Sequence, residues 1–184
     1  MKLIKNLCNN MHLRARLNEH RRALYRTAVA WSGDEMLADD LVQETLSRAL
    51  ANLHQLQDEA RLRAWLFRIL GNCWKEYLRR RREHLDVDGM ELAGEECCPE
   101  GDAQVHDTVR RVRLAIQCLP VPQREVVTLV DLNEFSYAEV AEILDVPIGT
   151  VMSRLSRARK ALLTLLQDDV MESPKVTRLR SVRR

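Results

Sequence analysis

The sequence predicts an all-α protein, built from two small helical domains that a flexible acidic linker joins. Hydrophobic residues make up 46% of the 184 residues, which is enough to build real cores. Six glycines, five prolines and few β-branched runs favour helices over strands. Apolar residues also recur at helical spacing on both sides of an acidic stretch without a clear period, residues 84–104.

The charge distribution divides the chain in the same way. Residues 1–83 contain 16 Lys and Arg against 10 Asp and Glu, a net +6; residues 84–104 contain none against 7, a net −7; the remainder contains 13 against 10, a net +3. A basic block is the electrostatic requirement for binding a phosphate backbone, and this chain has two of them. We therefore expect a domain at 1–83, a linker at 84–104, a second domain at 105–170 and a frayed basic tail at 171–184.

The pattern of the first domain is typical of three helices. The first starts at about residue 13 and ends at the Ser-Gly-Asp sequence of residues 32–34. The second has acidic residues in its first turn, which favours a helix start. A loop at 52–59 leads to a third helical segment, residues 60–82. The expected buried faces of the first two helices are Leu17, Leu24, Ala28 and Trp31, and Leu37, Leu41, Thr45 and Ala49.

The third segment mixes aromatic and basic side chains. Its expected buried stripe is Leu62, Leu66, Ile69 and Cys73. Trp65, Phe67, Trp74 and Tyr77 are interleaved with Arg61, Arg63, Arg68, Lys75 and Arg79, so several of these must lie off the stripe. Bases stack on aromatic faces while cations follow phosphates, which suits single-stranded or opened DNA. For any single tryptophan a core position is the better explanation, but the whole segment favours nucleic acid.

The second domain opens with a helical stripe that Pro120 ends: Val105, Val109, Val112, Ile116 and Leu119. Another helix is expected at about 123–132. After it, Ser136 and Glu139 form a capping box that starts a short helix. Its apolar stripe is Val140, Ile143 and Leu144, with Ala141 small enough for a second helix to cross closely.

A turn at residues 145–149 then interrupts the helical pattern. Pro147 cannot continue a helix, and Gly149 tolerates unusual dihedral angles. From Thr150 the pattern resumes with one buried face, namely Val151, Leu155, Ala158 and Leu162. The opposite face carries Met152, Ser153, Arg154, Ser156, Arg157 and Lys160. This arrangement predicts a helix-turn-helix whose second helix enters a major groove, because arginine suits guanine edges and phosphates.

An ordinary helical hairpin with a solvated basic face is the alternative, since charged helix faces are common. The capping box, the small crossing residue, the Pro/Gly turn and the one-sided arginines together favour DNA binding. On the second helix of the first domain, Asp40, Gln43 and Glu44 form a polar acidic surface. Physical chemistry alone explains that surface as a solvated helix face.

Several classes of function are disfavoured. No apolar run is long enough to cross a membrane, and residues 1–8 do not resemble a secretion signal. Five cysteines without framework spacing indicate a reducing compartment, so we expect a cytoplasmic protein. The adjacent Cys97 and Cys98, with His84 and His106 nearby, lack the usual C-x-x-C ligand spacing, so no metal or cofactor is expected. No phosphate loop, nucleophile elbow or ligand set indicates an enzyme.

Taken together, these blocks resemble the extracytoplasmic-function (ECF) sigma factors, the smallest group of bacterial RNA polymerase specificity subunits. Residues 39–45 are similar to the family's region 2.2 and residues 62–72 to region 2.3. Residues 121–126, 135–141 and 149–159 resemble region 4. A single helix-turn-helix is weakly specific, but three matched blocks in the right order are strongly specific. The resemblance covers about residues 17–166.

The resemblance implies roles for each surface. It places Asp40, Gln43 and Glu44 against the β′ clamp helices of the polymerase core, with the β flap as a second contact. The loop at 53–61 would recognise and hold the opened −10 element together with Arg61, Trp65, Asn72, Lys75 and Arg79. The −35 element would meet Ser153, Arg154, Ser156, Arg157 and Lys160. Met152 departs from the family, in which this position is often polar or basic, and suggests an individual promoter preference.

The same resemblance implies that the acidic linker lies near the RNA exit path and that an anti-sigma factor, often membrane-bound in this family, controls the protein. The alternative function is a stand-alone helix-turn-helix regulator that binds duplex operator DNA without polymerase. The aromatic and basic segment discriminates between the two, because a plain repressor does not need a strand-opening surface.

Overall fold

The computed structural model describes residues 2–56, 58–88 and 106–171, with side chains placed for 16–56, 58–83 and 108–167. All regular structure in these ranges is helical, in agreement with the predicted fold class. The N-terminal unit consists of α1 (Lys2–Ser32), α2 (Glu35–Ala51), the 3₁₀ turns η1 (Leu53–Gln55) and η2 (Glu59–Arg61), and α3 (Leu62–Asp88). The C-terminal unit consists of α4 (His106–Gln117), α5 (Val121–Val127), the π-helical turn η3 (Thr128–Leu132), α6 (Tyr137–Leu144) and α7 (Ile148–Met171). Within the described ranges, no helix is long and apolar enough to cross a membrane.

Local sequence signals set the helix ends of the N-terminal unit. Gly33 has a positive φ of 74°, which ends α1 because side chains rarely adopt that conformation. Asp34 then caps α2, and its Oδ1 accepts hydrogen bonds from the amides of Met36 and Leu37 at 2.8 and 3.1 Å. The predicted break at 32–34 is therefore confirmed. α1 begins well before residue 13, and α3 continues to Asp88, five residues into the segment expected to be linker.

The helix-turn-helix forms from α6 and α7. The predicted capping box is present: the Ser136 amide donates to Glu139 Oε2 at 2.8 Å, and the Glu139 amide donates to Ser136 Oγ at 3.3 Å. The turn differs in detail from the prediction. Asp145, with φ of 56°, takes the left-handed conformation, whereas Gly149 lies in the first turn of α7 with open space around its Cα. The amides of Thr150 and Val151 donate to the Pro147 carbonyl, so Pro147 starts α7.

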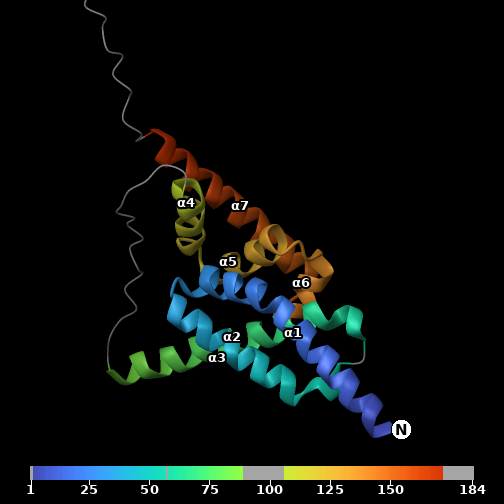
Figure 1. Cartoon of the computed structure of the whole chain (residues 1–184). Coiled ribbons are helices and arrows are strands. Elements are labelled where there is room, and N and C mark those ends of the chain that lie inside the picture. The colour runs from blue at the N-terminus through green and yellow to red at the C-terminus, as the bar shows by residue number, and fades with distance from the viewer. Residues whose placement is uncertain (1, 57, 89–105, 172–184) are drawn as a thin grey trace, which may run out of the picture.

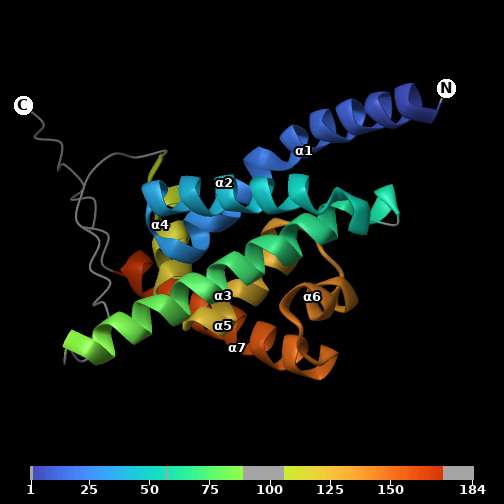
Figure 2. The same cartoon turned by 90° about the horizontal axis from the view of Figure 1, so that it is seen from below.

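The two units share one hydrophobic core. α3 lies between α2 on one side and the helix-turn-helix on the other in Figure 2, and Figure 1 shows that α1 runs between α2 and the C-terminal helices. α6 packs against α3, while α4, α5 and η3 pack against α1. The predicted buried stripes of α1 and α2 are confirmed apart from Leu37, which is half-buried. Phe67 and Trp74 are buried with them, so these two aromatic side chains belong to the core.

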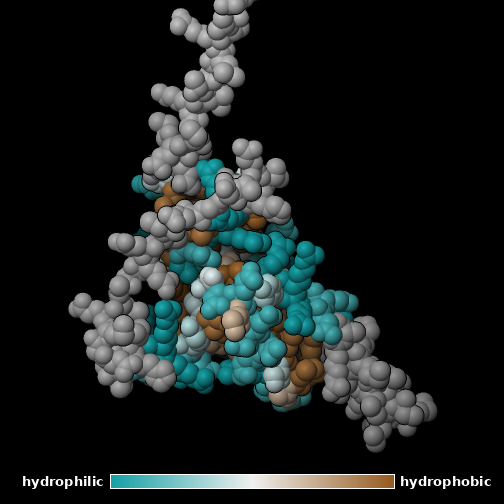
Figure 3. Space-filling view, turned by 60° about the vertical axis from the view of Figure 1, so that its left-hand side comes forward, coloured by the Kyte–Doolittle hydropathy of each residue, from teal (hydrophilic) through white to brown (hydrophobic). Residues whose placement is uncertain are grey.

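The C-terminal unit exposes part of its predicted stripe. Ile116 and Leu119 are buried, but Val109 on α4 is 57% exposed. Leu163 on α7, which was not part of a predicted stripe, is 59% exposed. The face in Figure 3 is otherwise largely hydrophilic, with the hydrophobic residues in a few patches. Among the described cysteines, Cys73 is a buried free thiol, whereas Cys118 takes part in a disulfide bond. Cys97 and Cys98 and the predicted linker beyond residue 88 lie outside the described residues, as does the tail from residue 172.

Candidate nucleic-acid interface

α3 carries a basic and polar stripe on one face. The predicted residues Trp65, Asn72, Lys75 and Arg79 lie on α3, and Arg61 is the last residue of η2, directly before α3. They follow one another at spacings of four, seven, three and four residues, which places them along one side of the helix. Arg68 fills the single gap in this series and is exposed. Arg68 was named among the basic residues of this segment but not assigned to the −10 element, and its helical spacing from Trp65 and Asn72 is the sequence signal that places it on the same face. We call these six residues the α3 stripe.

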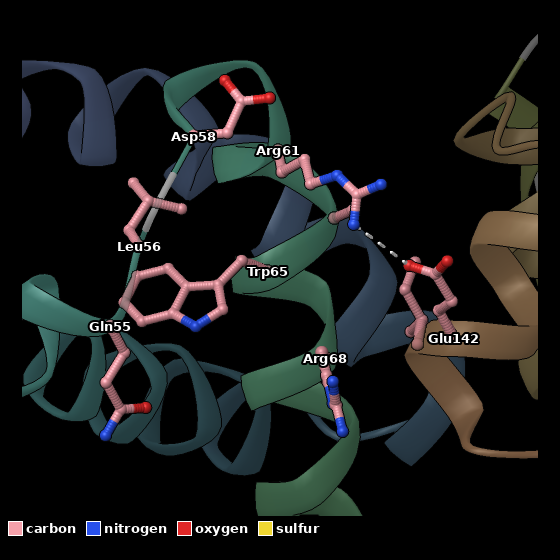
Figure 4. Close-up of a pocket in the computed structure, with 9 residues that line it drawn as sticks. Gln55, Leu56, Asp58, Arg61, Trp65, Arg68 and Glu142 are labelled. Carbon is pink, nitrogen blue, oxygen red and sulfur yellow. Dashed lines mark ion pairs between the residues drawn. The ribbon is translucent and has the colours of Figure 1, made fainter.

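A pocket of about 410 Å³ lies at the N-terminal end of the α3 stripe. Trp65 lies across it beside Leu56 and Gln55, and Arg61 and Arg68 flank the opening (Figure 4). Trp65 is only partly buried, so its ring remains accessible. The pocket therefore places an aromatic face beside two guanidinium groups. A nucleic-acid base can stack on the aromatic ring while the guanidinium groups contact the phosphate backbone.

The loop that forms the wall of this pocket is fixed at its C-terminal end. Asp58 Oδ1 accepts a hydrogen bond from the Ala60 amide at 2.9 Å, which caps η2. Arg16 of α1 donates to the Glu59 carboxylate at 2.6 Å. Residues 58–61 are thus held in place beside Trp65. The prediction from the sequence included the loop at 53–61 but did not identify Gln55, Leu56 and Asp58 individually as pocket residues.

Farther along the α3 stripe, polar groups contact α6. Lys75 Nζ donates to the Leu144 carbonyl at 2.6 Å, while Asn72 is exposed. Arg79 is exposed as well, with its Nε 3.7 Å from Glu83 Oε1. Tyr77, on the neighbouring face, stacks on Trp74 with ring centroids 5.7 Å apart. Of the predicted −10 residues, Trp65 is therefore partly buried in the pocket and the others are exposed, with Lys75 also bonded to the end of α6.

Glu125 of α5 lies buried next to this segment, with 7% of its surface exposed. Burial raises the pKa of its carboxyl group to about 6, while the positive charges of Lys75 and Arg154 act in the opposite direction. The indole Nε1 of Trp74 also lies close enough to lower that pKa, although it does not meet hydrogen-bonding geometry with any described residue. Sequence reasoning missed Glu125, because nothing in its helix indicates that α3 covers it.

The exposed face of α7 matches the predicted recognition face. Val151, Leu155 and Ala158 are buried and Leu162 is half-buried, which turns Ser153, Ser156, Arg157 and Lys160 toward solvent and leaves Arg154 partly exposed. Met152 is 54% exposed on the same side. Arg159 is held elsewhere: its Nη2 and Nε donate to the two Asp131 carboxylate oxygens at 2.6 and 3.1 Å. A bidentate pair of this kind anchors α7 to η3, so Arg159 is a structural arginine.

A second surface lies between α2 and α3, on a different side of the N-terminal unit. Asp40, Gln43 and Glu44 line a shallow pocket of about 720 Å³ with Tyr77 and the residues around it. Arg48 donates to Glu44 at 2.6 Å and to Glu76 of α3 at 2.8 Å, which joins the two helices. The hydrogen bond from Arg48 lowers the pKa of the Glu76 carboxyl group. The structure thus brings the three predicted residues together on an ordered, charged groove.

Comparison with known proteins adds independent information. Residues 17–84 match the family model described as sigma-70 region 2, and residues 110–162 match sigma-70 region 4. The chain is 43% identical, over 79% of its length and 80% of the relative's, to the ECF RNA polymerase sigma factor EcfG of Rhodopseudomonas palustris.

Two solved structures are also similar. The first is the sigma factor RpoE in complex with the anti-sigma factor NepR from Bartonella quintana, with a TM-score of 0.71, 35% identity and coverage of 86% of this chain and 98% of that one. The second is CnrH in complex with the cytosolic domain of CnrY, with a TM-score of 0.60, 30% identity and coverage of 87% and 88%.

Proposed function

The chain belongs to the ECF sigma factors of the sigma-70 family, and from this premise we propose how its surfaces direct transcription initiation. We assign residues 1–83 to core binding and −10 recognition, 84–104 to a linker, 105–170 to −35 recognition and 171–184 to a basic tail. Because a protein that binds RNA polymerase and promoter DNA acts in the cytoplasm, we also propose a cytoplasmic location for this chain. The protein acts as a specificity subunit without catalytic chemistry of its own.

The observation that carries the proposal is the pocket beside Trp65. It lies at one end of the α3 stripe, so a DNA strand that follows the basic residues reaches an aromatic face at the end of its path. Stacking on an aromatic ring requires an unpaired base, because a paired base is stacked on its neighbours. We assign Arg61, Trp65, Asn72, Lys75 and Arg79 to the opened −10 strand on this ground.

The exposed face of α7 supports −35 recognition. The helix is long, its buried face is fixed on the C-terminal unit, and Ser153, Ser156, Arg157 and Lys160 face solvent. Such a face fits the major groove, where arginine donates two hydrogen bonds to guanine. Arg154, which is partly exposed, completes the assigned set.

The groove with Asp40, Gln43 and Glu44 supports binding to the β′ clamp helices of the polymerase core. It lies on a face of α2 that neither α7 nor the pocket uses, so DNA and polymerase can bind together. We assign the β flap as the polymerase contact of the C-terminal unit. Because two similar sigma factors form complexes with the anti-sigma factors NepR and CnrY, we propose that an anti-sigma factor also holds this chain inactive.

A stand-alone regulator that binds duplex operator DNA is the competing function. Such a protein needs α7 but has no use for a single-strand pocket or for the groove on α2. In vitro transcription tests the difference: sigma-free core polymerase is mixed with the protein and a library of promoter fragments from the source genome. Promoter-dependent transcripts are expected, and their absence from every fragment, with duplex binding retained, would favour the regulator.

A further inference from the structure

Two large apolar side chains lie exposed at the start of α7. Ile148 is 48% exposed and Met152 is 54% exposed. They are four residues apart, so they lie one above the other on the same side of the helix. The core takes up Val151 and Leu155 from another face of α7 and leaves this pair in solvent.

The pair lies at the end of α7 that a helix-turn-helix places in the major groove. In such motifs the N-terminal residues of the second helix contact the base edges. Ser153, Ser156 and Arg157 are exposed directly after the pair. Exposed apolar residues scattered singly over a surface need no explanation. Two of them within the first two turns of a recognition helix indicate a role in contacting DNA.

Gly149 leaves room for a close approach at the same place. It follows Ile148 directly and is exposed. Its φ is not in the left-handed region, and a Cβ added there would meet nothing within 4 Å among the described residues. Neither the turn nor the core therefore requires a glycine, although glycine stabilises a helix less than alanine does. Its missing side chain lets the helix backbone come close to a base pair.

The hydrogen-bonding groups of the recognition face lie mainly farther along the helix. Ser153 Oγ donates its one hydrogen to the Thr150 carbonyl at 3.0 Å, so it offers a base only acceptor lone pairs. Arg157 and Lys160, the exposed cations of this face, follow Met152 by about one and two turns. The first two turns of α7 thus present a mainly apolar surface beside a polar and basic one.

The C5-methyl group of thymine is the apolar feature of the major groove. The other base-edge groups there are hydrogen-bond donors and acceptors, which isoleucine and methionine cannot satisfy. A methyl group that leaves water between these side chains gains the free energy of apolar burial. A protein or membrane partner requires a larger continuous apolar area, whereas the neighbouring arginine and lysine fit the phosphates on either side of a groove.

We propose, resting on the duplex recognition that we assign to α7, that Ile148 and Met152 read the C5-methyl group of thymine in the −35 element. The two residues then determine sequence preference together with the polar residues of the same face. Four residues of helix rise about 6 Å, and base pairs are stacked about 3.4 Å apart. The thymines that the pair reads therefore lie at one base pair or at neighbouring base pairs.

Deoxyuridine provides a selective test, because it lacks the methyl group of thymidine and keeps the same hydrogen-bonding groups. A duplex that binds the full-length protein would be selected from a randomised library, and each of its thymines replaced in turn by deoxyuridine. Fluorescence anisotropy should show that replacement at one or a few neighbouring base pairs weakens binding by about threefold or more, which is the effect of burying about one methyl group. Replacement elsewhere should change the affinity little.

Substitution of the two side chains completes a double-mutant cycle. The double variant Ile148→Gln with Met152→Gln should bind the thymine and deoxyuridine duplexes equally well, and the single variants assign each methyl group to one residue. Both positions are exposed, so the changes leave the core intact. Leu163→Gln makes the same kind of change at a 59% exposed position of α7 outside the first turns, and this matched control should keep the wild-type difference.

Wild-type binding that no deoxyuridine replacement weakens would overturn the proposal. So would a methyl effect that persists unchanged in the double variant, because the effect would then come from the DNA or from another residue. Failure of the proposed function looks different, since these measurements need only duplex DNA. The wild type would then yield no promoter-dependent transcript with core polymerase, while its binding would still depend on the thymine methyl group.

Discussion

The indole N–H of Trp31 donates a 2.6 Å hydrogen bond to the hydroxyl group of Thr128, 97 residues away in the chain. Both side chains are fully buried. The bond joins α1 of the N-terminal unit to η3 of the C-terminal unit. The unit that we assign to the −10 element and the unit that we assign to the −35 element are therefore part of one folded body. Its strength is open to direct measurement.

Thr128→Val should lower the free energy of unfolding by about 1–3 kcal/mol. Valine has nearly the same shape as threonine but leaves the buried Trp31 N–H without an acceptor. A buried donor without an acceptor destabilises the folded state, because it has lost its hydrogen bond to water as well. Thr128→Ser keeps the acceptor and is the control. Urea titration followed by tryptophan fluorescence measures both, and equal stability of the two variants would contradict the role of the bond.

Trp65→Ala should weaken binding of a single-stranded −10 oligonucleotide by about 1–3 kcal/mol, because it removes a ring on which a base can stack. Trp65→Phe keeps an aromatic face and should retain most of the affinity. Fluorescence anisotropy with single-stranded and duplex DNA separates the effects. A loss of duplex binding as large as the loss of single-strand binding would argue against a role specific to unpaired bases.

Arg157→Ala should weaken binding to the −35 duplex by about 1–3 kcal/mol if the guanidinium makes a bidentate base contact. Arg159→Ala, on the same helix, is the matched control, because Arg159 is held by Asp131 and faces away from the recognition surface. Binding would be measured on a duplex selected from a randomised library. Similar losses for the two variants would remove Arg157 from the base-contacting set.

Gln43→Ala combined with Glu44→Lys should impair association with core polymerase, since it removes one polar group and reverses one charge in the groove between α2 and α3. Glu19→Lys makes the same charge reversal on an exposed position of α1 and serves as the control. Co-purification with tagged core polymerase measures the effect. Normal recovery of the double variant would contradict the assignment of this groove.

Glu125 should make stability depend on pH. Its pKa is raised to about 6 by burial, from 4.5, so the folded protein binds this proton more tightly than the unfolded chain does. The stabilisation is therefore complete below about pH 4.5 and is lost as the pH rises through about 6, a difference of about 2 kcal/mol. Glu125→Gln should remove this dependence and be more stable than the wild type at pH 7.5.

His20 affects the wild type in the opposite direction, because burial lowers its pKa and stability then falls as the pH falls. Urea titrations of the wild type and Glu125→Gln at pH 5 and pH 7.5 cancel the His20 contribution, since both proteins contain it. The difference between the two proteins should grow with pH, and a constant difference would contradict the buried position of Glu125.

The sequence by itself determined the helices and the order of the blocks. The Ser136–Glu139 capping box and the break at Gly33 act within a few residues of themselves, so their effect is visible without knowledge of the rest of the chain. The buried face of α7 followed from helical spacing for the same reason. The α3 stripe was also recognisable, although Arg68 was named only as a basic residue of the segment and was not assigned to the −10 element.

Only the tertiary structure decided which faces are covered. Phe67 and Trp74 look like the other aromatic residues of their helix, yet they are buried, while Val109 continues an apolar stripe and is exposed. The contact between Trp31 and Thr128 depends on how α1 and η3 fit together in space. Helical spacing fixes which residues share a face, but shape and polar complementarity between helices far apart in the sequence determine which partner covers that face.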